Sequence, residues 1–220
     1  MKKQLLIFLF VGCGLVVNAQ QINETYYKDS YLTKEVEEKK AKFKKVETQG
    51  ADGIVNIQIF NLSKNCLLSD KNYKDNIPVG VWTTNNENCS LEKKRDFSKL
   101  VYTNEQISTL CSNVIKDGNS NSFVVAQYGD NENAFYQYLI SNVRYPAEAR
   151  EEGIEGRVYL QFIVEADGSI KNVSIRRGVN TFLDFEAWEL IVNMPKWNPA
   201  KKDGQPVDSC YDLPISFTLK

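Results

Sequence analysis

Hydrophobic and polar residues alternate along the C-terminal part of the chain. The runs Arg157–Val164 and Ile170–Arg176 alternate strictly, and Val207–Leu219 does the same. A period of two predicts β-strands with one buried face. Asp167-Gly168 lies between the first two runs and predicts a hairpin turn. We therefore expect three antiparallel strands.

Segments whose apolar residues have helical spacing precede these strands and lie between them. Asp130-Asn131 can cap a helix. Proline as first residue and Gly153 beyond the end define a short helix over Pro146–Glu152. Thr181-Phe-Leu-Asp184 has the form of a capping box, and the helix that it opens ends at Pro195. The pattern predicts two helices on one face of a three-stranded antiparallel sheet.

Residues 20–125 are more polar, with short alternating runs. The charged segment Lys34–Val46 could form a helix. It leads, however, into the turn signal Gly50–Gly53 and the apolar run Ile54–Phe60, which favours a strand–turn–strand interpretation. Thr103–Lys116 has helical spacing. We expect an α+β protein with a mainly β-hairpin domain at 20–125, a boundary near Gly129 and a second domain at 130–220.

A faint repeat lies in the first domain. Asn65-Cys66-Leu-Leu recurs as Asn88-Cys89-Ser-Leu, and Tyr73, Gly80 and Trp82 lie between or beside the two copies. This pattern resembles degenerate hairpins of the membrane-occupation-and-recognition-nexus (MORN) type. If such hairpins stack in register, Cys66 and Cys89 become neighbours and could form a disulfide. Four buried thiols remain the alternative for the cysteines beyond residue 19.

The first residues have the pattern of a secretory signal peptide. Lys2-Lys3 is basic, Leu5–Val17 is apolar, and small residues end at Ala19. We expect residues 1–19 to be a signal peptide and the protein to be periplasmic. A retained inner-membrane anchor, or lipidation at Cys13, are the alternatives.

Composition excludes several classes of function. The chain is 42% hydrophobic and 25% charged, with net charge −1 and no histidine. It therefore has no basic surface for nucleic acid, no His-ligated metal site and no His-dependent catalytic triad. Carboxylates such as Glu151, Glu152 or Asp184 could serve an enzyme, but each is explained as a helix-surface charge or a cap. We expect no catalytic residues, no metal and no cofactor.

Pro214 predicts the position of the last strand. Proline donates no ladder hydrogen bond, so its strand belongs at a sheet edge or a bulge. An open edge can accept a partner's extended segment by strand addition, or it can merely be protected against aggregation.

The region from residue 140 to 220 resembles the C-terminal domain of TonB-type energy transducers, in the form common in Bacteroidetes-like bacteria. The matching stretches are Tyr145-Pro146, Gly153-Ile-Glu-Gly156-Arg-Val, Phe162-x-Val164, Asp167-Gly168-Ser-Ile, Glu186-Ala187, Met194-Pro195-Lys-Trp197-x-Pro199-Ala200, Gly204-x-Pro-Val207 and Leu213-Pro214-Ile215-x-Phe217.

The resemblance implies a non-enzymatic module that binds the N-terminal box of outer-membrane receptors by strand addition, in TonB-dependent transport. It implies partner contacts at the Tyr-Pro motif and along the last strand: Tyr145, Pro146, Ser209, Cys210, Tyr211, Asp212, Leu213, Ile215, Ser216 and Phe217. With only six prolines, the chain lacks the Pro-rich spacer of the family's transducers. Two alternatives stay open: a membrane-anchored transducer that contacts the motor complex through a retained N-terminal segment, and an exported interaction module unrelated to transport.

The signal peptide generates a direct prediction. Cleavage after Ala19 leaves Gln20 as the first residue of the exported protein. N-terminal sequencing of the protein from the bacterial envelope should therefore begin at Gln20. A sequence that begins at Met1 would support the anchored alternative instead.

Overall fold

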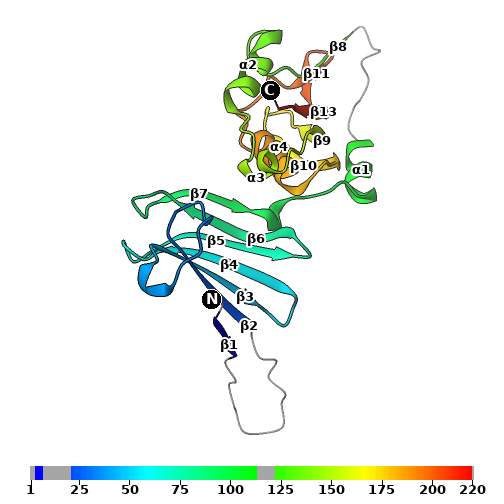
Figure 1. The fold of residues 1–220 in the computed structure, drawn as a ribbon. Coiled ribbons are helices and arrows are strands. Elements are labelled where there is room, and N and C mark those ends of the chain that lie inside the picture. Colours follow the sequence, from blue (N-terminus) through cyan, green and yellow to red (C-terminus); the bar gives the residue numbers. More distant parts are fainter. Residues whose placement is uncertain (1–2, 7–20, 113–121, 220) are drawn as a thin grey trace, which may run out of the picture. The chain divides into compact units, whose positions relative to one another are not determined.

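The computed structural model describes residues 3–6, 21–112 and 122–219, and the chain divides into two compact units, Met1–Lys99 and Leu100–Lys220 (Figure 1). The first unit is an antiparallel sheet. The second combines helices with two small sheets. The expected α+β class is confirmed.

Among the described residues of the first unit, seven strands form one sheet, in the order of the chain. The strands are β1 (Lys3–Leu6), β2 (Gln21–Tyr27), β3 (Phe43–Gln49), β4 (Ile54–Asn61), β5 (Cys66–Lys74), β6 (Ile77–Asn85) and β7 (Leu91–Asp96), with short 3-10 helices at Glu38–Lys40 and Phe97–Lys99. Strands β3 and β4 flank the Gly50–Gly53 turn, so the strand–turn–strand interpretation of this region is correct. The MORN-like character of the hairpins stays a prediction.

An aromatic cluster and a disulfide organise this sheet. Trp82 is 2% exposed and packs between Tyr73 and Phe97, with ring centroids 4.6 and 5.0 Å away. Its indole nitrogen donates to the Asn72 carbonyl at 2.8 Å. Cys66 and Cys89 form a disulfide with Cα atoms 6.1 Å apart, which ties the start of β5 to the loop between β6 and β7.

Strand β1 lies within the predicted signal peptide and pairs with β2. Residues 7–19, which hold most of that signal and its cleavage position, lie outside the described residues. Cleavage after Ala19 would remove β1 and leave β2 at the edge of the sheet. Within the described ranges, no helix has the length and apolar character needed to cross a membrane.

The central sheet of the second unit has the strand order β10–β9–β13. Its strands are β9 (Gly156–Val164), β10 (Ile170–Arg177) and β13 (Ser209–Phe217), and its helices are α1 (Glu105–Ser112), α2 (Glu132–Asn142), α3 (Ala147–Glu151) and α4 (Thr181–Val192). Val158, Leu160 and Phe162 are at most 1% exposed and form the core face of β9. Helix α4 packs against β9 and β10, and α3 packs against α4.

The second unit begins earlier than the predicted boundary near Gly129. The Thr103 amide donates to the Ile175 carbonyl at 2.8 Å, and the Ile175 amide donates to Val101 at 2.7 Å. A disulfide joins Cys111 to Cys210, with Cα atoms 5.5 Å apart. These contacts span 70 to 100 residues of sequence, roughly, so local composition does not reveal them.

The sequence pattern also did not reveal a second small sheet. Strands β8 (Phe123–Val124), β11 (Ala200–Lys202) and β12 (Gln205–Val207) form it in the order β12–β11–β8. Val207, expected in the last long strand, belongs to β12 instead. Asp208 separates the two strands, and its carboxylate accepts the Ala166 amide at 2.8 Å.

The N-cap of α4 is Asn180, one residue before the expected start. Its side chain accepts the amides of Phe182 and Leu183, so the predicted capping role of Thr181 is wrong. Asp184 instead accepts the Val179 amide at 2.8 Å.

Gly168 allows the β9–β10 turn to approach Trp197 closely. Its φ angle is +84°, and a Cβ atom there would lie 2.1 Å from the Trp197 carbonyl oxygen. The Trp197 amide donates to the Gly168 carbonyl at 2.9 Å. Lys196 adds an ion pair to Asp167 at 2.7 Å, which holds the pKa of that carboxyl well below its ordinary value. The turn therefore fixes Trp197 through its backbone.

Replacement of Gly168 should test this contact. Gly168→Ala introduces an unfavourable positive φ and a backbone clash, whereas the control Gly204→Ala introduces only the first, since nothing lies within 4 Å of a Cβ at Gly204 (φ +81°). We expect the control to lower the free energy of unfolding by about 1–2 kcal/mol and Gly168→Ala to lower it by more than about 3 kcal/mol. Chemical denaturation of both variants measures the difference, and equal losses would contradict the close approach.

A candidate partner-binding edge and aromatic pocket

Strand β13 has one paired edge and one open edge. It pairs with β9 from Ser209↔Val164 to Phe217↔Gly156 without a shift in register. Among the described residues, no strand lies on its other side. The opposite edge of the sheet differs, because Val101 and Thr103 exchange backbone hydrogen bonds with Ile175 of β10. One edge is thus partly covered and the other is open.

Pro214 indicates which backbone groups of β13 face outward. In an antiparallel pair, alternate residues direct their amide and carbonyl groups to the partner strand, and the residues between them direct these groups away. Pro214 has no amide hydrogen, and the pairing continues through it without a bulge. It therefore belongs to the outward set, with Cys210, Asp212 and Ser216.

Side chains of β13 alternate between a buried face and an exposed face. Ser209, Ile215 and Phe217 are buried on one side, whereas Asp212, Pro214 and Ser216 are exposed on the other. Two of the exposed side chains already have partners. Asp212 contacts Gln161 and Arg176 at 3.0 Å, and the Ser216 hydroxyl accepts from Arg157 Nε at 3.0 Å.

Cys210 differs from the other predicted contact residues because its sulfur is bonded to Cys111 of α1. Its side chain lies on the same face as Asp212, since the two are separated by two positions. The disulfide attaches α1 to that face, and Cys111 is only 2% exposed. The backbone amide and carbonyl groups of Cys210 still belong to the outward set.

The predicted Tyr-Pro motif supports the end of β13 from within the domain. The Tyr145 ring lies edge-on to Phe217, with centroids 5.8 Å apart, and its hydroxyl donates to the Ile154 carbonyl. Partial burial raises the pKa of Tyr145, and the nearby charge of Glu155 raises it further by a smaller amount. Pro146 is buried and precedes α3 as its N-cap. The Tyr145 ring thus helps to position the end of β13.

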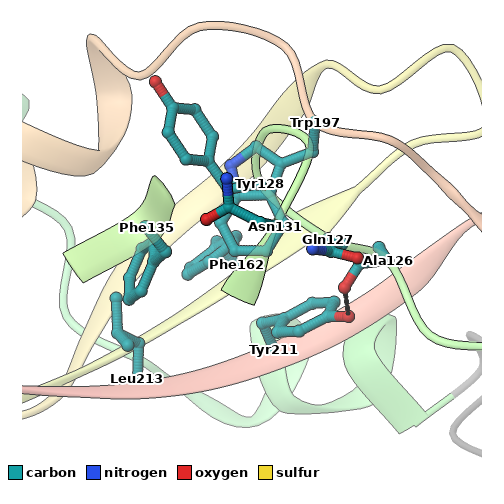
Figure 2. A pocket seen from close by; sticks show the side chains of 9 residues that line it. All are labelled: Ala126, Gln127, Tyr128, Asn131, Phe135, Phe162, Trp197, Tyr211 and Leu213. Atoms are coloured by element: carbon teal, nitrogen blue, oxygen red, sulfur yellow. Dashed lines mark hydrogen bonds between the residues drawn. The ribbon is translucent and has the colours of Figure 1, made fainter. Parts of the chain in front are cut away.

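A pocket of about 280 Å³ lies beside β13 (Figure 2). Its walls come from the segment before α2, from α2 and β9, from the loop before β11 and from β13 itself. They consist of Ala126, Gln127, Tyr128, Asn131, Phe135, Phe162, Trp197, Tyr211 and Leu213. No lysine, arginine or carboxylate lines it.

Aromatic contacts hold the pocket together. The Trp197 ring lies 5.2 Å from Tyr211, 5.6 Å from Phe135 and 5.7 Å from Phe162, measured between centroids. Phe162 and Tyr211 are stacked, with an interplanar angle of 17°. Rings at these separations attract one another and resist rearrangement. The Trp197 indole nitrogen has no hydrogen-bond partner in the described part of the chain.

Backbone hydrogen bonds fix the outer wall. The Tyr211 hydroxyl donates to the Ala126 carbonyl at 2.6 Å, the bond drawn in Figure 2. Gln127 and Asn198 exchange two backbone hydrogen bonds of 2.9 and 2.8 Å. Burial raises the pKa of Tyr211, so its hydroxyl stays protonated as a donor near neutral pH. The pocket is therefore preformed.

The sequence pattern did not identify this pocket. The sequence places a domain boundary near Gly129, and it shows Trp197 only as part of the Met194–Ala200 motif. The sequence signal that could have indicated the pocket is the presence of three aromatic residues, Tyr128, Phe135 and Trp197, next to short polar segments. Their proximity depends on the Gln127–Asn198 pairing, which spans 71 positions and has no local signature.

The carboxylates considered for catalysis do not converge. Glu151 and Glu152 are exposed at the end of α3. Asp184 is 2% exposed and accepts hydrogen bonds from Val179 N and the Tyr102 hydroxyl. Burial raises the pKa of Asp184, and its contacts tie α4 to neighbouring segments. Their geometry is that of surface and structural residues.

Comparison with known proteins agrees with the sequence resemblance. A solved structure, the NMR solution structure of the Helicobacter pylori TonB-CTD, aligns with 39% of this chain and 77% of that chain, at 28% identity and a TM-score of 0.32. No curated protein matches the chain. The family model for the Gram-negative bacterial TonB protein C-terminal matches residues 141–219, which include β9, β10, α4 and β13. Residues 141–219 of the second unit are therefore similar to the TonB C-terminal family.

Proposed function

We propose that this protein is a non-enzymatic, periplasmic TonB-like module that binds the N-terminal segment of outer-membrane receptors. The partner's segment adds as a further strand to the open edge of β13. The observation that carries the proposal is the asymmetry of the sheet: one outer strand is covered by residues 101–103, and β13 is not paired on its outer side within the described residues.

Backbone chemistry favours an extended peptide as the partner. An unpaired strand edge offers amide donors and carbonyl acceptors at a regular spacing, which a second strand satisfies along its whole length. The outward row at Cys210, Asp212 and Ser216 supplies both kinds of group, and Pro214 supplies only an acceptor. A partner strand can therefore pair along most of β13, with one missing hydrogen bond at Pro214.

The match to the TonB C-terminal family supports an outer-membrane receptor as the source of this peptide. The signal-like pattern of residues 1–19 supports the periplasm as its location. The first unit is a separate domain whose partner the proposal leaves open. The Tyr145–Phe217 contact keeps the end of β13 in place.

Proline at an outward position should abolish binding while the fold survives. Ser216→Pro removes an outward amide and places a ring where the partner strand would approach. We expect the affinity of the full chain for a receptor N-terminal peptide to fall by at least about tenfold. Isothermal titration with synthetic peptides from the receptors of the same bacterium measures this.

Ser216→Ala is the matched control. It also loses the hydrogen bond from Arg157, but it keeps the amide. Its affinity should stay within about twofold of the unchanged protein. If Ser216→Pro binds the peptide as tightly as Ser216→Ala does, strand addition at this edge is wrong.

A further inference from the structure

Side chains of β13 line the pocket, and the backbone of this same strand forms the open edge. Tyr211 and Leu213 both line it, and they alternate with Cys210, Asp212 and Pro214 of the outward row. The same strand therefore carries the unpaired backbone edge and part of the pocket lining. Figure 2 shows Tyr211 and Leu213 extending from β13 beside Phe162, with Phe135 and Trp197 closing the same space.

Strand geometry determines what would reach this pocket. In a paired strand, the residue directly opposite Tyr211 or Leu213 places its Cβ about 4.5–5.5 Å from theirs, on the same face of the sheet. Residues one position away point to the other face. Every second side chain of an added strand thus passes over the pocket, and the remaining ones face Asp212 and Ser216.

The size of the pocket is sufficient for one large side chain. Sites for drug-sized small molecules occupy about 300–1,000 Å³, and this pocket, with about 280 Å³, lies just below that range. Its lining is almost wholly aromatic and aliphatic. Asn131, one of the few polar side chains in it, is already used, because it accepts the Asn133 amide at 3.0 Å as the cap of α2. A charged side chain would find no oppositely charged partner there, since no lysine, arginine or carboxylate lines the pocket.

We propose that the pocket is the specificity site of the β13 edge and binds one large apolar side chain, aliphatic or aromatic, of the added peptide. This inference rests on the proposed function, since strand addition brings the side chain to the pocket. The edge supplies affinity that depends little on sequence, and the pocket selects peptides with a large apolar residue opposite Tyr211 or Leu213. The preformed walls keep the loss of conformational entropy on binding small.

The test uses the full chain and a receptor N-terminal peptide that binds it. Each peptide position is replaced in turn by alanine, and the position most sensitive to this change is then also replaced by aspartate. We expect losses at every second position, with about a tenfold loss at the residue over the pocket and a larger loss for aspartate. An affinity that shows no such alternation contradicts the proposal without any change to the protein.

Two protein variants locate the effect. Phe135→Ala removes a pocket wall that lies on α2, away from the strand edge. Ile140→Ala truncates a residue of the same helix that is 74% exposed and does not line the pocket. With Phe135→Ala, alanine at the sensitive peptide position should cost less than about threefold, and with Ile140→Ala it should still cost about tenfold.

The outcomes separate this inference from the proposed function. If Ser216→Pro abolishes binding but Phe135→Ala leaves the sensitivity of the peptide position unchanged, strand addition stands and the pocket proposal is wrong. If no receptor peptide binds at all, both proposals are wrong. Thermal melting of each variant shows whether the fold is intact, and the peptide series on the unchanged protein decides the question if Phe135→Ala does not fold.

Discussion

The second unit depends on the pairing of β9 with β13, which uses one of the two rows of backbone groups of β13. Every strand has two rows of donors and acceptors, and burial of either row without partners is unfavourable. Strand β9 satisfies the inner row along the whole of β13. No strand of the described residues pairs with the outer row, which in our proposal binds a partner strand. The proposed function follows from this unequal use of one strand.

The rest of the domain keeps that strand in position. Phe217 is fixed at one end by Tyr145, and Cys210 is fixed at the other by its disulfide to Cys111. Between these ends, Tyr211 is held by its hydrogen bond to Ala126. The constraints lie on both faces of the sheet, and no strand of the described residues occupies the outer edge. A rigid edge loses little entropy when it pairs, which favours binding of a flexible peptide.

Much of this domain could be predicted from the sequence because its signals are local. Alternation in Arg157–Val164, the Asp167-Gly168 turn and the proline at 214 are short-range features, and each strand or turn appears where they indicate. The early start of the unit at Leu100 and the sheet β12–β11–β8 could not be predicted, because both depend on contacts between distant segments. The pocket belongs to this second class, because its wall from residues 126–131 is held there by the Gln127–Asn198 pairing and by the Tyr211–Ala126 hydrogen bond, both between distant segments.

Amide hydrogen exchange of the full chain, resolved by residue, tests the open edge most directly. In the free protein, the amides of Asp212 and Ser216 should exchange much faster than those of their neighbours Leu213 and Ile215, which donate to β9. Addition of a receptor peptide should slow the first pair and leave the second unchanged. Equal protection of all four amides in the free protein would mean that another part of the chain already occupies the edge, and would contradict the account.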